Sequence, residues 1–202
     1  GIYSNGPLTI TSSSLISNTA VNTGTQEGQG GAIYFGGDES SRLVVNNAEI
    51  LTNTADNGGG GIFISSTLVL ADSRLTGNLT TNASGTGGAL ACSNCSFAIE
   101  GGSFAGNEAQ LGGALYITAT TVQGHSAITG SQFQGNRATP ASNGKGGAIY
   151  VDYYDTITIS GTAILSNAAN TGGGLFVRSI DATGMMTMTG EPAAAPATKR
   201  YT

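Results

Sequence analysis

A six-residue glycine motif recurs along the chain and restricts its fold more than any other feature of the sequence. It reads GGAIYF at Gly30–Phe35, and close copies occur at Gly59–Ile64, Gly87–Cys92, Gly112–Ile117, Gly146–Val151 and Gly172–Val177. The copies begin roughly 25 to 34 residues apart, a period typical of solenoids and other repeat architectures. Because Gly1–Ser4 matches the last four positions of the motif, we expect the solenoid to extend before Gly1.

A second motif lies between the glycine motifs and contains alternating apolar residues followed by an asparagine. One copy consists of Leu43, Val45, Ile50, Asn53 and Ala55. The same spacing returns five more times, ending at Asn18, Asn78, Asn107, Asn136 and Asn167. Short alternating runs bounded by Gly, Asn and Ser indicate half-buried strands.

These repeats predict an all-β fold, a right-handed parallel β-helix of about six or seven coils. The strands are too short, and the repeat too long, for hairpins, so each strand is expected to pair with its own copy in the next coil. Two inward columns follow: Ile33, Ile62, Leu90, Leu115, Ile149 and Leu175, and Phe35, Ile64, Cys92, Ile117, Val151 and Val177. We expect residues 1–190 to form this single domain and residues 191–202, with Pro192 and Pro196, to be a tail or linker.

Composition excludes several classes of protein. The net charge of −5 and the scattered 7 Lys and Arg residues disfavour nucleic acid as a partner. No apolar run approaches the roughly 20 residues that span a membrane as a helix. The isolated Cys92 and Cys95 lack further ligands for zinc and fit either a short-loop disulfide or, for Cys92, a buried thiol.

The coil alignment also assigns roles to polar residues. The asparagines that end each repeat are expected to form a structural ladder in which amides bond along the axis: Asn18, Asn53, Asn78, Asn107, Asn136 and Asn167. Opposite charges stack at exposed positions, which pairs Glu49 with Arg74, Glu108 with Arg137 and Asp152 with Arg178.

The combination of GGA(I/L) with F-x-x-N resembles the repeats of chlamydial polymorphic outer-membrane proteins. The motifs are Phe104–Asn107 before Gly112–Leu115, and Phe133–Asn136 before Gly146–Ile149. In that family the repeats form the surface-exposed, adhesive passenger of an autotransporter. The resemblance implies the same β-helix and an extracellular or cell-surface location, although Leu or Ile replaces the phenylalanine in four of six copies.

Two other function classes remain open. Many parallel β-helices are polysaccharide lyases or glycoside hydrolases, which need converging carboxylates. Asp155 and Asp181 share an offset from their glycine motifs and are a weak candidate for such a pair or for a metal site. An ice-binding or filament-forming protein is the second alternative, but the threonine row that begins at Thr9 is interrupted by valine and alanine.

We therefore expect a scaffold without catalytic residues or cofactor, which binds partners through an aromatic row. The row contains Tyr3, Tyr34, Phe63, Tyr116, Tyr150 and Phe176, each between two inward residues, and is interrupted at Ala91. Tyr153 and Tyr154 are expected to extend this surface onto a loop. The expected partner is a protein or glycan at a surface, or a neighbouring copy in a larger assembly.

Overall fold

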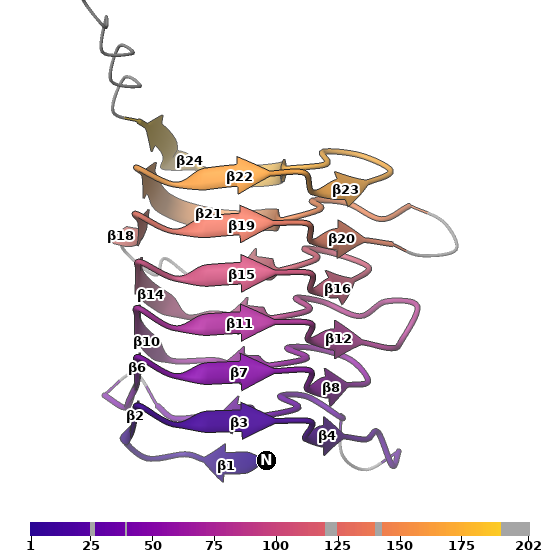
Figure 1. Cartoon of the computed structure of the whole chain (residues 1–202). Helices are drawn as coiled ribbons and strands as arrows, with labels where there is room; N and C mark the ends of the chain where they lie inside the picture. Colours follow the sequence, from indigo (N-terminus) through magenta and orange to yellow (C-terminus); the bar gives the residue numbers. More distant parts are fainter. Residues whose placement is uncertain (25–26, 39, 120–124, 140–142, 191–202) are drawn as a thin grey trace, which may run out of the picture.

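The computed structural model is an all-β parallel solenoid, in agreement with the expected β-helix (Figure 1). It describes residues 1–190 except 25–26, 39, 120–124 and 140–142, and the side chains of 153, 155 and 179–184 are also outside the described part. The expected tail, residues 191–202, lies outside the described residues. Within the described part, no helix is long and apolar enough to cross a membrane.

The strands form four parallel stacks along the solenoid axis. The first stack contains β1 (Ile2–Ser4), β5 (Ile33–Phe35), β9 (Ile62–Ile64), β13 (Leu90–Ser93) and β17 (Leu115–Thr118). The second contains β2 (Leu8–Thr11), β6 (Arg42–Asn46), β10 (Thr67–Ala71), β14 (Ser96–Glu100) and β18 (His125–Thr129). The long strands β21 (Ile149–Ser160) and β24 (Leu175–Thr189) run through both stacks and join them into one 12-stranded sheet.

The third and fourth stacks are separate six-stranded sheets. The third contains β3 (Ser14–Ile16), β7 (Glu49–Leu51), β11 (Arg74–Thr76), β15 (Ser103–Ala105), β19 (Gln132–Gln134) and β22 (Ala163–Leu165). The fourth contains β4 (Thr19–Ala20), β8 (Thr54–Ala55), β12 (Leu79–Thr80), β16 (Glu108–Ala109), β20 (Arg137–Ala138) and β23 (Ala168–Ala169). Each strand pairs with its own copy in the next coil, so the solenoid has about six turns.

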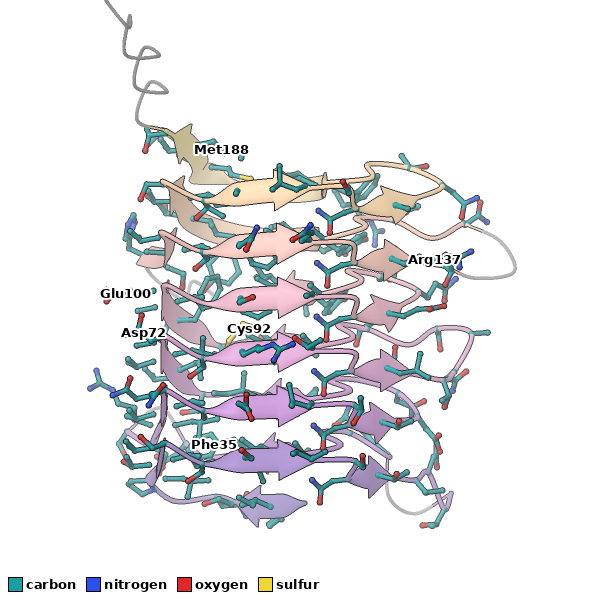
Figure 2. All side chains as sticks on the ribbon, in the orientation of Figure 1. Phe35, Asp72, Cys92, Glu100, Arg137 and Met188 are labelled. Carbon is teal, nitrogen blue, oxygen red and sulfur yellow. A yellow bond between two sulfur atoms is a disulfide. The ribbon has the colours of Figure 1, made fainter. Side chains whose placement is uncertain are left out.

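The interior is filled by the apolar columns that the repeat predicts, except in the last coil, where Val177 is 38% exposed. Ile33 pairs with Ile62 and Phe35 with Ile64, and all four side chains are fully buried. On the opposite wall, Phe104 stacks on Phe133 with ring centroids 4.5 Å apart. Figure 2 places the labelled Phe35 and Cys92 within the stacked coils and Asp72, Glu100 and Arg137 at their edges. Each buried side chain of this size stabilises the fold by roughly 1.5 to 3 kcal/mol.

The glycine motif makes a corner that other residues cannot occupy. Its first glycine has a positive φ, +60° at Gly59, which is rare for residues with a side chain. A Cβ on its second glycine, Gly60, would lie 2.4 Å from the carbonyl oxygen of Gly88 in the next coil. The third position is an alanine with no exposed surface in four copies, as at Ala89, and a glycine at Gly61 and Gly174. The corner therefore requires two glycines and one small residue in succession.

The asparagines form a continuous hydrogen-bonded ladder. The side-chain amide of Asn107 donates to Asn136 Oδ1 and to the Leu75 carbonyl, both at 2.9 Å. Its own Oδ1 accepts from the backbone and side-chain nitrogens of Asn78 at 2.9 and 3.0 Å. The same pattern connects Asn18, Asn53, Asn78, Asn107, Asn136 and Asn167, and the four central members are fully buried.

A second hydrogen-bonded corner, formed by hydroxyl groups, was not predicted from the sequence. Ser73 Oγ accepts from the backbone nitrogen of Ala48 in the preceding coil and donates to the carbonyl of Ala71. Ser131 does the same with Gly102 and Thr129. These hydroxyls complete backbone hydrogen bonds at the turn between the second and third stacks.

The expected charge pairs test the alignment of coils. Arg74 lies directly opposite Glu49, with Nη1 3.9 Å from Oε1, and Arg137 lies opposite Glu108. Arg178 Nη1 lies 3.0 Å from Asp152 Oδ2. The predicted register is correct for the first two pairs. For the third it is wrong by one residue, because the pairing shifts after Val151 and Asp152 lies opposite Ser179, although its carboxylate still contacts Arg178. Asp152 was also expected to be exposed, whereas only 6% of its surface is accessible. The exposed pair Glu49–Arg74 contributes at most about 1 kcal/mol.

The cysteines form a disulfide, which decides between the two alternatives that the sequence left open. Cys92 and Cys95 are bonded and both are fully buried. The bridge closes the corner between β13 and β14 on the inner side of the coil.

The ladder predicts a large stability difference between buried and exposed asparagines. Asn107→Ala removes two donors and one shared acceptor, so the free energy of unfolding should fall by roughly 1 to 3 kcal/mol. Asn46→Ala is the matched control, because Asn46 is exposed on β6 and its neighbour in the next coil is already Ala71. Urea unfolding measures both; equal midpoints would show that the ladder does not stabilise the fold.

Candidate partner-binding surface

The central residues of the first-stack strands form one outward row. Tyr3 pairs with Tyr34, Tyr34 with Phe63, and Phe63 with Ala91, and the register continues through Tyr116, Tyr150 and Phe176. Their strand neighbours face the core, so the period of two directs these side chains away from it. We call Tyr3, Tyr34, Phe63, Tyr116, Tyr150 and Phe176 the aromatic row.

The rings of the row are stacked face to face in two groups of three. Tyr3, Tyr34 and Phe63 have centroids 5.1 and 5.2 Å apart, and their planes differ by 3° and 12°. Tyr116, Tyr150 and Phe176 have centroids 5.3 and 5.2 Å apart, with planes that differ by 13°. Ala91 separates the groups, as the sequence indicates. The inter-coil distance thus sets the ring spacing.

The two groups differ in exposure. The Tyr3 side chain is 70% exposed, whereas Tyr34, Phe63, Tyr116 and Phe176 are half-buried. Tyr150 is only 3% exposed, because it lies between two stacked rings and next to the Asp152–Arg178 pair. The expectation of an evenly exposed row is therefore wrong at Tyr150, and Tyr3 is the one ring of the row that is mostly exposed.

Burial and charge shape the electrostatics of the row. Burial raises the pKa of the Tyr116 phenol, since desolvation disfavours the phenolate. The pKa of Tyr150 is also raised, first by burial and then by the carboxylate of Asp152. Lys145 places its Nζ 5.3 Å from the centroid of Phe176, within the range of a cation–π interaction.

Tyr154 corrects the expected extension of this surface onto a loop. Its side chain is 1% exposed and lies in the core, where its ring centroid is 6.0 Å from that of Phe97. Its hydroxyl donates to the Cys95 carbonyl at 2.7 Å and shares a 2.6 Å hydrogen bond with Ser126 Oγ. Irregular register along β21 breaks the period of two between Val151 and Thr156, which turns Tyr154 inward. The Tyr153 side chain is outside the described part.

The candidate acid pair is only partly placed. Asp155 and Asp181 directly follow Tyr154 and Ile180, which pair across β21 and β24, but their side chains lie outside the described ones. Among the described residues, no group of three or more His, Cys, Asp or Glu could hold a metal ion. The distance between these two carboxylates is therefore not defined by the described residues.

A hollow adjoins the exposed end of the row and was not predicted from the sequence. It has a volume of about 400 Å³ and lies between β1 and the turn that follows β4. Its wall contains the rings of Tyr3 and Tyr34, together with Glu27 and Gln29. The Tyr34 pKa is raised by burial, then by Tyr3 and by the Glu27 carboxylate. Glu27 has no counterpart at the same position in the other coils, so the repeat pattern could not mark it as a residue of this hollow.

One comparison with known families finds a match, and it covers a single repeat. Residues 130–152 match the Chlamydia polymorphic membrane protein repeat. The matched segment contains both motifs on which the resemblance depends, Phe133–Asn136 and Gly146–Ile149. No curated protein and no solved structure matches the chain significantly. The repeat resemblance is confirmed for this segment.

The raised phenol pKa values predict a stability loss in alkali. Tyrosines of the unfolded chain ionise near pH 10. Tyr116 and Tyr150 ionise at higher pH in the folded state, so the free energy of unfolding falls as pH rises above about 10. A Tyr116→Phe and Tyr150→Phe double variant should lose less stability between about pH 9 and 11. The midpoint of urea unfolding, measured at each pH, tests this. Midpoints that fall equally with pH in the double variant and the original chain would contradict the prediction.

Proposed function

We propose that this parallel β-helix is a non-catalytic cell-surface scaffold whose aromatic row contacts a protein or glycan partner. The observation that carries the proposal is the outward alignment of six aromatic side chains on one sheet. Tyrosine and phenylalanine bring large contact areas with little loss of conformational entropy on binding. All of these rings except Tyr150 keep accessible surface, and contiguous apolar side chains on a surface are typical of an interaction site.

The surface location has two independent supports. The segment 130–152 matches a repeat of membrane proteins, and the chain is a β-helix built from copies of the motifs in that segment. The Cys92–Cys95 disulfide is the second support, since disulfides persist in oxidising compartments and are rare in the cytosol. Together they favour an exported protein over an intracellular one.

A scaffold accounts for the described residues better than a polysaccharide lyase or glycoside hydrolase does. Such enzymes need two or more carboxylates that converge near a cation. The buried carboxylate of Asp152 is instead paired with Arg178 at 3.0 Å, and the exposed Glu49 faces Arg74. Each of these acids is paired with an arginine of the next coil. A neighbouring copy of the chain remains an alternative partner for the row.

The proposal predicts that binding depends on the row and not on other apolar surface. A Tyr34→Ser, Phe63→Ser, Tyr116→Ser triple variant should bind at least about tenfold more weakly to its targets on a glycan array or to immobilised cell-surface glycoproteins. The matched control, Ile16→Ser, Leu51→Ser, Leu165→Ser, removes outward apolar side chains of the third stack.

Circular dichroism and a thermal melt establish that both variants are folded. The control should bind within about twofold of the original chain. Unchanged binding by a folded row variant, or an equal loss in the control, would contradict the proposed function.

A further inference from the structure

Three N-x-S/T sequons, the acceptor sequence for N-linked glycans, lie close together in the chain. They are Asn78–Thr80, Asn82–Ser84 and Asn94–Ser96. A sequon of this kind normally marks an exposed loop. The first sequon departs from this rule, because Asn78 is fully buried in the ladder and only 5% of the surface of Thr80 is accessible.

We propose that Asn78 accepts an N-linked glycan while the chain is unfolded, and that the glycan then prevents the solenoid from assembling. The reaction needs an oligosaccharide transferase and a lipid-linked oligosaccharide as donor. Nδ2 of Asn78 forms a bond to the sugar carbon C1, the bond between C1 and the phosphate oxygen breaks, and lipid diphosphate leaves. Nδ2 gives up one proton to the solvent. The inference goes beyond the proposed function, because it concerns the maturation of the chain and not its binding surface.

The folded ladder uses both hydrogens of the Asn78 amide. Nδ2 donates to the carbonyl of Ile50 at 2.9 Å and to Asn107 Oδ1 at 3.0 Å. A glycosylated amide keeps a single N–H, so one of these two hydrogen bonds is lost. The sugar would also have to lie between the coils of Asn53 and Asn107, where Asn78 has no accessible surface. The folded solenoid therefore has no room for a glycan at this position.

Asn78 stays accessible to the transferase until the next coil has been synthesised. Its ladder partner Asn107 lies 29 residues further along the chain. Synthesis at roughly 5 to 20 residues per second needs a few seconds to reach it. Parallel pairing between distant segments also folds slowly, because the entropy of closing each coil is lost before the contacts form. Modification of Asn78 therefore precedes folding wherever the transferase meets the growing chain.

The neighbouring sequon provides a comparison within the same chain. Asn82, Ala83 and Ser84 are all exposed, in the turn that follows β12 (Figure 1). The backbone nitrogen of Gly85 donates to the Asn82 carbonyl at 2.9 Å, and this hydrogen bond does not involve the side chain that would be modified. A glycan on Asn82 can lie in the solvent and leaves the ladder intact.

Thr80→Ala separates the sequon from the ladder. The hydroxyl oxygen of Thr80 is buried without a hydrogen-bond partner, and Ala55 lies opposite Thr80 in the preceding coil. The variant therefore removes the acceptor sequence but keeps every hydrogen bond of Asn78. Thr80→Ser is the matched control, because Asn-x-Ser is still an acceptor sequence.

The test directs the full chain into the secretory pathway of cultured mammalian cells and also produces it in a bacterial periplasm that lacks the transferase. Mass spectrometry of glycopeptides should find Asn78 glycosylated in the mammalian cells. The yield of folded, secreted chain should rise at least about fivefold in Thr80→Ala and stay within about twofold in Thr80→Ser. Chains from the periplasm should all fold, with melting temperatures within about 4 °C of one another.

A folded, secreted chain that carries a glycan on Asn78 would overturn the inference. Absence of this glycan from both the secreted and the retained chain would do the same, as would equal folded yields of the original chain and Thr80→Ala, or an equal gain in Thr80→Ser. None of these results affects the proposed function, because partner binding of the aromatic row is measured on chain from the periplasm.

Discussion

Amide hydrogen bonds that run from coil to coil are the constraint on which the rest of this structure depends. A parallel stack of short strands can slip or splay, since each coil contacts only its neighbours. The asparagine ladder prevents this, because each buried amide satisfies groups in the coil before and the coil after its own. Leaving one of these groups unpaired would cost more than the hydrogen bond itself stabilises.

The fixed register has consequences on the outside of the solenoid. Because Tyr34 lies directly opposite Tyr3 and Phe63, their rings stack at the spacing of the coils. The glycine corner contributes as well, since a side chain at Gly60 would push the next coil away at Gly88. Interior packing and main-chain geometry therefore position the outward surface that we propose as the binding site.

The repeat predicts most of what recurs from coil to coil, which includes the parallel pairing, the apolar columns and the position of Glu49 opposite Arg74. The recurring hydroxyl corner at Ser73 and Ser131 was missed, because serine is common throughout the chain. The repeat also fails where a coil departs from its neighbours. Tyr154 was expected on a loop beside the row, but it lies in a strand with irregular register and its side chain is buried in the core. Glu27 occurs once, in a turn of one coil, and only the folded chain brings it to Tyr34.

Hydrogen exchange of side-chain amides tests the central claim, that a buried asparagine ladder fixes the register and with it the outward row. The account predicts that the side-chain Nδ2 protons of Asn53, Asn78, Asn107 and Asn136 exchange at least about a thousandfold more slowly than those of the exposed Asn46, because exchange requires the coils to open. Exchange of all these amides at similar rates would contradict the account.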